Sequence, residues 1–375
     1  MPLKILIIDP YYPTFLSSFY SKYPDAKNLT HQKQKQKLFK ELFGTADFYS
    51  NALTKIGHPG EDIILNNESL QKQWLKENGS IFLSIKDRFQ DFTIKHLPLV
   101  AGKIAQNWEL KILDQQIKVF KPDVIYSHNI GYLDPGFLKT IKPRVKLIVG
   151  QIACPIPFWQ NFKPYDLIIT SFPHYLKKFK QKGIKAEYLP LCFESSILKQ
   201  IPSQKRIYDF TFIGGISRAH QQGFKLLNQL ADQVKIDVWG YGKEELNPKS
   251  QLYKYHHGEA WGKDMYKLML QSKITLNRHI DVAKNYANNT RLYEATGCGT
   301  MLLTDQKNNL SDLFAVGKEV VAYTDIHDLV KKANYYLNHN KERQKIAKAG
   351  QKRTLKDHNY QVRMTQLVEI LQKYI

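Results

Sequence analysis

Residues 286–305 restrict the fold of this chain more than any other stretch, because a loop, a short helix, a tight turn and a buried strand follow one another within them. Residues 288–290 are Asn, Asn and Thr, which are favoured at the N-cap of a helix. Gly297 and Gly299 would end that helix, and the apolar run 300–303 predicts a buried strand after it. A helix N-terminus offers unpaired N–H groups and a partial positive charge to a phosphate.

Arg291 and Glu294 are three residues apart and share one face of the predicted helix. The arginine can give a phosphate a charge-assisted hydrogen bond, and the carboxylate can accept hydrogen bonds from a ribose. The alternative is a surface ion pair that contributes only about 0.2–0.5 kcal/mol. A surface helix does not need the Gly-Cys-Gly turn and the buried strand that follow, so we favour a site for a sugar nucleotide.

A longer motif contains this pair. Asn-x-Arg-x-x-Glu-Ala-x-x-Cys-Gly, which begins at Asn289, resembles the donor-binding segment of GT-B glycosyltransferases. It is most similar to the group-1-like, family-4-like domain of CgeB-type enzymes. The resemblance covers most of residues 206–370, whereas the first half of the chain resembles the family only in general layout. It implies a hexosyltransferase that uses a nucleoside diphosphate sugar as co-substrate, without a metal or another cofactor, and it favours a retaining over an inverting outcome.

The sequence departs from the family at one position. Retaining family-4 enzymes usually carry Glu-x7-Glu, and Tyr286 stands where their first glutamate would be. That glutamate normally contacts the hydroxyls of the donor sugar, so the departure leaves the sugar and the stereochemical outcome open. Asn277, Arg278 and Asp281 are nearby polar residues that could substitute for it.

Strand-like apolar runs alternate with helical stretches along the whole chain, which predicts a parallel α/β architecture. The clearest runs are 5–8, 124–126, 147–149, 167–170, 210–213, 235–239, 274–277 and 301–304. We therefore expect a GT-B fold of two Rossmann-like, doubly wound domains that face each other across a cleft. The first domain would span 1–203 and bind the acceptor, the second would span 204–359 and bind the nucleotide sugar, and the amphipathic helix 360–375 would pack back on the first.

A second donor-binding segment is expected directly after the strand at 210–213. Gly214 and Gly215 would let the backbone approach a ligand closely, and Arg218 would lie at the carboxyl edge of the sheet. By resemblance, Arg218 contacts the donor diphosphate; the alternative is a plain strand-to-helix turn with a surface arginine. Asn277, Asn289 and Thr290 complete the expected donor site with Arg291 and Glu294.

Catalytic and acceptor residues are expected in the first half. His128 follows the strand at 124–126, where it could contact the donor sugar or act as a general base, and Asp134 is a second candidate base. Tyr11, Tyr12 and Gln151 follow other strands and are candidate acceptor contacts, although the tyrosines could equally pack an interface. His128 could also be an ordinary loop histidine.

The bulk composition excludes several classes of protein. At 375 residues with 43% hydrophobic and 24% charged residues, the chain has the composition of a folded protein of two domains. No apolar run reaches the roughly 20 residues that span a bilayer, and the run at 3–8 is too short for a signal peptide. The three cysteines have no paired spacing, which fits a reducing cytoplasm, and the adjacent pair His256 and His257 lacks further ligands for zinc.

The formal net charge of +21 has two interpretations. One is a solvated, lysine-rich surface; the other is attraction to an anionic membrane face or glycan through the basic segments 139–146 and 177–185. No motif for nucleic acid is present, so nucleic acid is not expected as a partner.

The sequence therefore predicts a cytoplasmic glycosyltransferase, peripheral on the inner face of a membrane. It would move a sugar to a glycan or lipid-linked acceptor in the synthesis of cell-surface polysaccharides or glycoconjugates. Two alternatives remain open at this point: a non-catalytic, basic binding protein on the same scaffold, and a nucleotide-sugar epimerase of the same fold. The base, the sugar, the acceptor and the oligomeric state are not encoded in a recognisable motif.

Overall fold

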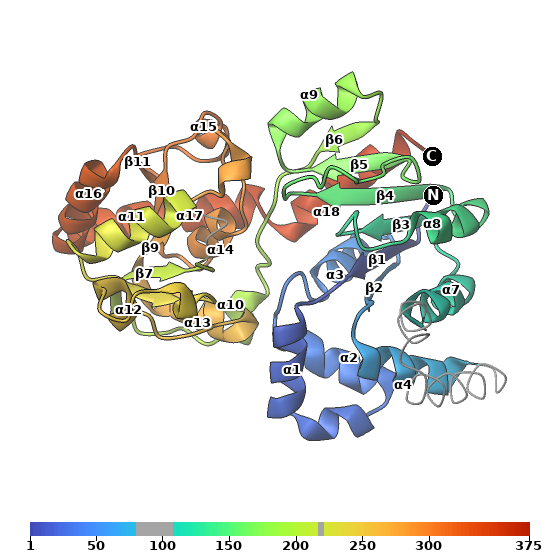
Figure 1. The fold of residues 1–375 in the computed structure, drawn as a ribbon. Helices are drawn as coiled ribbons and strands as arrows, with labels where there is room; N and C mark the ends of the chain where they lie inside the picture. The colour runs from blue at the N-terminus through green and yellow to red at the C-terminus, as the bar shows by residue number, and fades with distance from the viewer. Residues whose placement is uncertain (80–107, 217–220) are drawn as a thin grey trace. The chain divides into compact units, whose positions relative to one another are not determined.

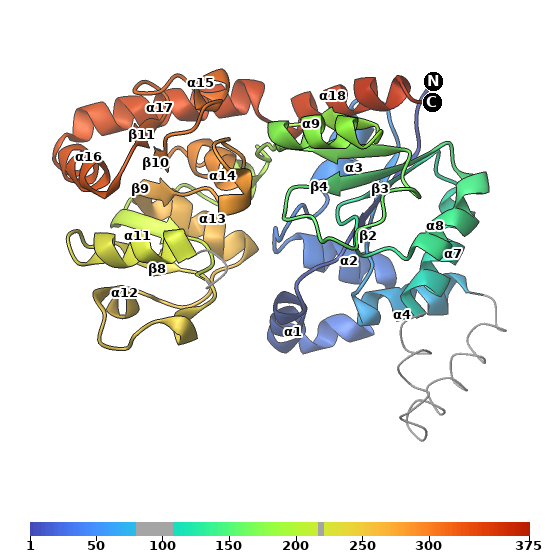
Figure 2. The same ribbon diagram turned by 45° about the horizontal axis from the view of Figure 1, so that its top comes forward.

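The computed structural model describes residues 1–79, 108–216 and 221–375, and these form two compact units with one parallel β-sheet each (Figures 1 and 2). The first unit comprises Met1–Thr170, Leu176–Glu187 and Leu367–Ile375, and the second comprises Ser171–Tyr175 and Tyr188–Gln366. The chain thus passes into the second unit earlier than the boundary expected at 203–204. Its last nine residues cluster with the first unit.

The sheet of the first unit has its described strands in the order β2-β1-β3-β4-β5-β6. Their bounds are β1 Ile5–Asp9, β2 Gly60–Ile64, β3 Val124–Ser127, β4 Leu147–Ile152, β5 Leu167–Thr170 and β6 Ala186–Tyr188. Strand β1 lies between β2 and β3 in parallel register, with Ile5 opposite Gly60 on one side and Val124 on the other. The apolar residues of β1, β3 and β5 are almost fully buried, as strands covered on both faces require.

Helices connect these strands in the described part of the first unit. They are α1 Pro13–Lys22, η1 Pro24–Asn28, α2 His31–Phe39, α3 Phe48–Lys55, α4 Glu68–Asn78, α7 Trp108–Phe120, α8 Pro135–Ile141, η2 Lys142–Arg144 and α9 Pro173–Gln181, which begins in the second unit. Three of them begin at side-chain caps: Thr30 accepts a hydrogen bond from the backbone of Lys33, Asn67 one from Leu70, and Asp134 one from Phe137.

The sheet of the second unit has the order β11-β10-β9-β7-β8. Its strands are β7 Tyr208–Ile213, β8 Asp237–Trp239, β9 Ser272–Asn277, β10 Met301–Asp305 and β11 Val321–Tyr323. Every strand expected from the sequence is present in the two sheets, and the two-sheet α/β architecture confirms the expected fold class. The strands β2 and β11 were not among the expected ones.

Helices cover the second sheet as well. They are α10 Ile197–Gln200, α11 Gln221–Ala231, η4 Lys243–Glu245, α12 Gln251–Lys254, α13 Gly262–Gln271, η5 Asp281–Ala283, α14 Arg291–Gly297, α15 Leu310–Leu313, α16 Ile326–Asn338, α17 Asn340–Asp357 and α18 Tyr360–Gln372, whose end lies in the first unit. Alternate strand residues, such as Ile274 and Leu276, join Leu227 of α11 and Leu329 of α16 in one apolar cluster. Helices α13, α14 and α17 also pack against the strands.

Arg206, just before β7, donates hydrogen bonds to several backbone carbonyl groups at one edge of the second sheet. Its Nη1 lies 2.8 Å from the carbonyl oxygen of Met269 and 2.7 Å from that of Ser272. Its Nη2 lies 2.9 Å and 2.7 Å from the carbonyl oxygens of Cys298 and Gly299. One guanidinium therefore satisfies the ends of α13 and α14 and the start of β9, and burial lowers the pKa of this arginine.

We expect Arg206→Lys to lower the free energy of unfolding by about 2–4 kcal/mol, because a lysine ammonium cannot reach all of these carbonyl groups and leaves some of them unpaired. Urea unfolding followed by circular dichroism measures the change. The exposed neighbour Lys205 provides the control, since Lys205→Ala should stay within about 0.5 kcal/mol of the wild type. An Arg206→Lys protein that unfolds at the wild-type urea concentration would contradict this role.

Candidate functional site

A cavity of about 220 Å³ lies at the carboxyl ends of β7 and β9 in the second unit. The strand order reverses between these two neighbouring strands, because β8 lies on one side of β7 and β9 on the other. In open parallel sheets, ligands bind at such a reversal. Of the expected donor residues, the cavity brings together Gly214, Gly215, Asn277, Asn289, Thr290 and Arg291. Glu294 does not line it, and Arg218 lies outside the described residues.

The glycines after β7 allow two loops to lie against each other. The backbone N–H of Gly214 donates to the carbonyl of Trp239 at 2.8 Å, so the loops after β7 and β8 continue the pairing of their strands. A Cβ atom at Gly215 would lie 2.0 Å from the ring of Tyr241. Glycine is therefore required here by packing as well as by any ligand, and both glycines face the cavity.

Asn277 and Asn289 hold the loop that leads to α14 onto the end of β9. The Asn289 amide donates to Asn277 Oδ1 at 2.7 Å and lies 3.2 Å from the carbonyl oxygen of Arg278. The Asn277 amide donates to Thr304 Oγ1 at 2.9 Å. Asn289 Oδ1 accepts the backbone N–H of Leu292 at 3.3 Å. These amide groups already have protein partners, so they position the loop as well as line the cavity.

Helix α14 is shorter than a good anion site requires. It has seven residues, Thr290 at its N-cap makes no side-chain capping bond, and Asn289 uses one of its first N–H groups. A short helix has a weak dipole, so charged side chains must provide most of the attraction for a phosphate. Gly297 and Gly299 end the helix as expected, and Gly299 has a φ of +68°.

Arg291 and Glu294 form a buried pair rather than a surface one. Arg291 Nη1 lies 2.8 Å from Glu294 Oε2, and the two side chains are 16% and 12% exposed. The hydroxyl of Tyr266 donates to Glu294 Oε1 at 3.3 Å. Burial, and to a smaller extent the charge of Glu294, raises the pKa of Tyr266 well above its usual range. Arg291 lines the cavity, whereas Glu294 is not among the residues that line it.

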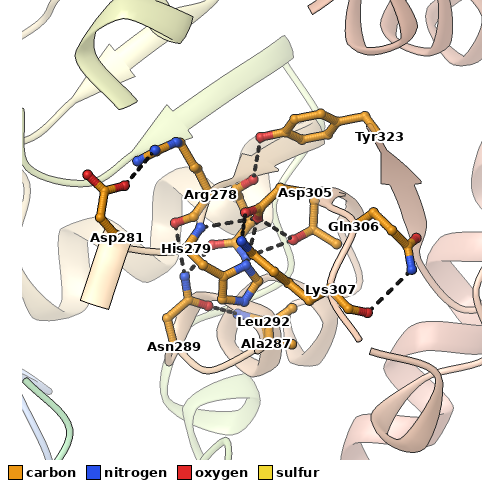
Figure 3. Close-up of polar contacts among 12 residues, drawn as sticks. Arg278, His279, Asp281, Ala287, Asn289, Leu292, Asp305, Gln306, Lys307 and Tyr323 are labelled. Carbon is orange, nitrogen blue, oxygen red and sulfur yellow. Dashed lines mark hydrogen bonds and ion pairs between the residues drawn. The ribbon is translucent and has the colours of Figure 1, made fainter. Parts of the chain in front are cut away.

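Two further charged pairs lie beside the cavity (Figure 3). Arg278 turns toward Asp281, with Nη2 2.8 Å from Oδ1. His279 turns toward Asp305, with Nδ1 2.6 Å from Oδ1, and Lys307 lies 3.1 Å from the same carboxyl group. Burial would raise the pKa of Asp305, but the hydrogen bond and charge of His279, with the charge of Lys307, lower it to about 2.

His279, Asp305 and Lys307 were not among the site residues expected from the sequence. The available signal was that polar residues end two consecutive apolar strands, and parallel neighbours bring such ends together. Tyr286, which replaces the expected glutamate, stacks on His174 with ring centroids 5.4 Å apart and planes at 15°. No acidic group occupies that place among the contacts described for Tyr286.

A second polar group lies at the strand-order reversal of the first sheet. His128 follows β3 and Asp9 ends β1, with His128 Nδ1 3.3 Å from Asp9 Oδ2. The imidazole is 8% exposed and packs against Tyr49 and Tyr126. Its Nε2 has no hydrogen-bond partner among the described residues. This is the arrangement of a histidine held by a carboxylate with one nitrogen left for a reacting group.

The other expected residues of the first unit have structural contacts. Gln151 Oε1 accepts from the hydroxyl of Tyr126 at 2.9 Å. Tyr11 is buried in an aromatic cluster with Phe15 and Phe43. Burial, and to a smaller extent the charge of Asp9, raises the pKa of Tyr11 well above its usual range.

Tyr12 is 55% exposed. Asp134 caps α8 by accepting the backbone N–H of Phe137 at 2.9 Å, and this capping bond is the role that the structure gives it. Its place as a candidate base therefore stays a prediction.

Several residues of the basic segments are neutralised by acids of the first unit. Lys142 pairs with Asp166, Arg144 with Asp114, and Lys146 with Asp123. No helix in the described parts of the chain is long and apolar enough to cross a bilayer. Within the same residues, no cluster of three histidine, cysteine, aspartate or glutamate side chains could hold a metal ion.

The chain is similar to a known protein family in sequence and to solved structures in fold. Residues 221–369 match the family described as glycosyl transferase-like, and no curated protein matches the sequence. The fold is similar to Anabaena Alr3699/HepE in complex with UDP and glucose, with a TM-score of 0.57 at 13% identity over 99% of this chain and 100% of that one. A glycosyltransferase from Rickettsia africae ESF-5 has a TM-score of 0.55 at 11% identity, over 100% and 98% of the two chains.

AviGT4, a glycosyltransferase involved in avilamycin A biosynthesis, has a TM-score of 0.54 at 12% identity over 100% of this chain and 98% of its own. At these identities the likeness concerns the fold. Residues 221–369 thus match the glycosyl transferase-like family, within a chain whose fold is similar to that of GT-B glycosyltransferases.

Proposed function

We propose that this glycosyltransferase takes its sugar from a nucleoside diphosphate sugar and transfers it to a glycan or a lipid-linked acceptor. The observation that carries the proposal is the cavity at the strand-order reversal of the glycosyl transferase-like unit. It gathers a glycine loop, Arg278 and Arg291, which are the groups that a diphosphate needs. Anabaena HepE, which shares the fold, has been solved with UDP and with UDP-glucose, so a uridine diphosphate sugar is the first donor to test.

In this proposal the diphosphate lies against the backbone of Gly214 and Gly215. Arg291 would donate hydrogen bonds to a phosphate oxygen, and Arg218, which lies outside the described residues, would contact the diphosphate as the resemblance implies. Glu294 would bind the ribose, as the family resemblance implies; because Glu294 does not line the cavity, donor binding would have to open its pair with Arg291. Arginines and backbone N–H groups would stabilise the leaving diphosphate, so the proposed reaction needs no metal ion.

The acceptor is assigned to the first unit, with His128 as the group that handles its proton. Asp9 would hold Nδ1 and leave Nε2 to contact the reacting hydroxyl. A retaining outcome follows from the family resemblance. An inverting outcome is the second candidate, and the observation that favours it is the Asp9–His128 pair, because a histidine oriented by a carboxylate is suited to act as a general base.

We further propose that the protein works at the cytoplasmic face of a membrane, in the assembly of surface polysaccharides or glycoconjugates. The support is the net charge of +21 and the basic segment 177–185, whose first lysines lie on α9. Exposed basic residues of this kind attract an anionic lipid surface at about 1 kcal/mol each.

Glu294→Gln should bind the matching nucleoside diphosphate at least about tenfold more weakly than the wild type, because the charge-assisted hydrogen bonds to the ribose and to Arg291 are weakened. Isothermal titration of both proteins with UDP, GDP, dTDP and ADP measures this. Asp264→Asn is the charge-matched control, since Asp264 is 64% exposed on α13 and pairs only with Lys267 in the described contacts.

If none of the four nucleotides bound to the wild type, the donor site would be refuted and the non-catalytic scaffold would replace it. A bound nucleotide together with an isomerised free sugar nucleotide, and no transferred sugar, would instead indicate an epimerase.

His128→Ala should lower kcat/KM for sugar transfer by about 10²–10⁴-fold and leave the affinity for the nucleoside diphosphate unchanged, because the residue acts on the acceptor and not on the donor phosphates. Asp9→Asn should give a smaller loss, since it disturbs only the orientation of the imidazole. His327→Ala, at an exposed position of α16, is the control and should be fully active. Wild-type turnover in His128→Ala would remove His128 from the mechanism.

A further inference from the structure

His279 is buried next to the cavity and uses only one of its two ring nitrogens. Its side chain has no exposed surface, and Nδ1 lies 2.6 Å from Asp305 Oδ1. The same carboxylate oxygen accepts the backbone N–H of His279 at 3.1 Å. Nε2 has no hydrogen-bond partner among the described residues. A buried polar atom without a partner is unusual in a native protein, which points to a group that binds there.

The surroundings fix which ring nitrogen is available. Figure 3 shows the imidazole between Asp305 and the segment that carries Ala287, Asn289 and Leu292. Asp305 ends β10, and its carboxylate is also 3.1 Å from Lys307, whose ammonium donates to the carbonyl of Lys284. A carboxylate at Nδ1 favours a proton on that nitrogen, so Nε2 is the nitrogen left to contact a ligand. His279 is among the residues that line the cavity with the glycine loop and Arg291, but its imidazole has no exposed surface, so donor binding would have to shift the ring or the segment that covers it.

The charges near the cavity balance when His279 is neutral. The described cations that face the site are Arg278 from the loop after β9, Arg291 from α14 and Lys307 after β10. Three carboxylates oppose them: Asp281, Glu294 and Asp305. The uncharged but titratable hydroxyl of Tyr323 on β11 donates to the carbonyl of Asn277. Among these described groups, three cations against three anions leave no net charge, so a protonated His279 makes the set positive.

We propose that His279, held by Asp305, is a further ligand of the donor diphosphate, whose Nε2–H donates to a phosphate oxygen when the imidazole is protonated. The proposal rests on the proposed function and deepens it, because it makes donor binding take up a proton. Binding of the anion favours the charged imidazole, and the charged imidazole favours binding of the anion. The affinity for the diphosphate then falls as the pH rises and Nε2 loses its proton.

A purely structural role for His279 is the competing explanation, because the imidazole also fastens the loop after β9 to the end of β10. His279→Asn separates the two roles. An asparagine amide can occupy the position of Nδ1 and donate to Asp305, which keeps the fastening, but it places no donor where Nε2 lies. His327→Asn, at an exposed position of α16 in the same unit, is the matched control.

The experiment is isothermal titration of wild type, His279→Asn and His327→Asn with UDP, GDP, dTDP and ADP between about pH 6 and about pH 9. Comparison with the variant at each pH cancels the protonation of the nucleotide itself. We expect the nucleotide that binds the wild type to bind His279→Asn about tenfold more weakly at the lowest pH, with the difference shrinking toward the highest. The control should match the wild type throughout, and the melting temperature of unliganded His279→Asn should stay close to that of the wild type.

Equal affinities at every pH, or a difference that does not change with pH, would overturn this inference and leave the donor site intact. A wild type that binds none of the nucleotides would overturn the proposed function and this inference with it. The wild type alone provides a second test, which does not depend on the folding of a variant. At about pH 8, titration in buffers of different ionisation enthalpy should show proton uptake on binding, and the absence of uptake would overturn the proposal.

Discussion

The reversal of strand order beside the first strand of each sheet is the constraint on which the rest of this molecule depends. In both sheets the first strand lies between the second and the third, as β1 lies between β2 and β3, and β7 between β8 and β9. The loops after the first and third strands then leave in opposite directions, and the carboxyl ends of these strands stay uncovered. The two polar groups that the structure assembles lie at these two places: Asp9 with His128, and the cavity after β7 and β9.

The cavity of the second unit is shaped by contacts between residues of the protein itself. The Arg206 guanidinium donates to carbonyl groups at the start of β9 and in the glycine turn, on the side away from the cavity. On the cavity side, the ring of Tyr241 packs against Gly215. Asn277 and Asn289 join the strand to the loop before α14. The loops around the cavity are thus held by buried hydrogen bonds before any nucleotide arrives, which reduces the ordering cost of binding.

The sequence predicted what depends on local pattern. The strands at 5–8 and 274–277 were recognised because they are continuous apolar runs, and Gly299 was placed correctly because a helix end with positive φ favours glycine. Strand β2 was missed because it contains Glu61 and Asp62. Asp62 is nevertheless buried, and burial raises its pKa to about 7, so the side chain enters the core partly as a neutral acid.

The pairs that depend on tertiary contact could not be predicted in the same way. Asp9 and His128 are separated by more than a hundred residues, and His279 meets Asp305 only because β9 and β10 are neighbours in register. The i, i+3 spacing of Arg291 and Glu294 placed them on one helix face, as observed, but spacing alone does not tell whether that face is buried. The burial of this face follows from the packing of α13 and α14.

The net charge of the chain has little influence on the donor cavity. Salt screens exposed charges over about 8 Å under physiological conditions, and this applies to the exposed part of the surplus of +21. Several of the basic residues in the 139–146 segment are already paired with acids of their own unit. Among the described groups around the cavity, by contrast, three cations and three carboxylates are matched and partly removed from water, where each unit of charge acts more strongly. The charge of these described groups therefore depends on a local balance, which the proton proposed on His279 would tip, and not on the excess of lysine in the sequence.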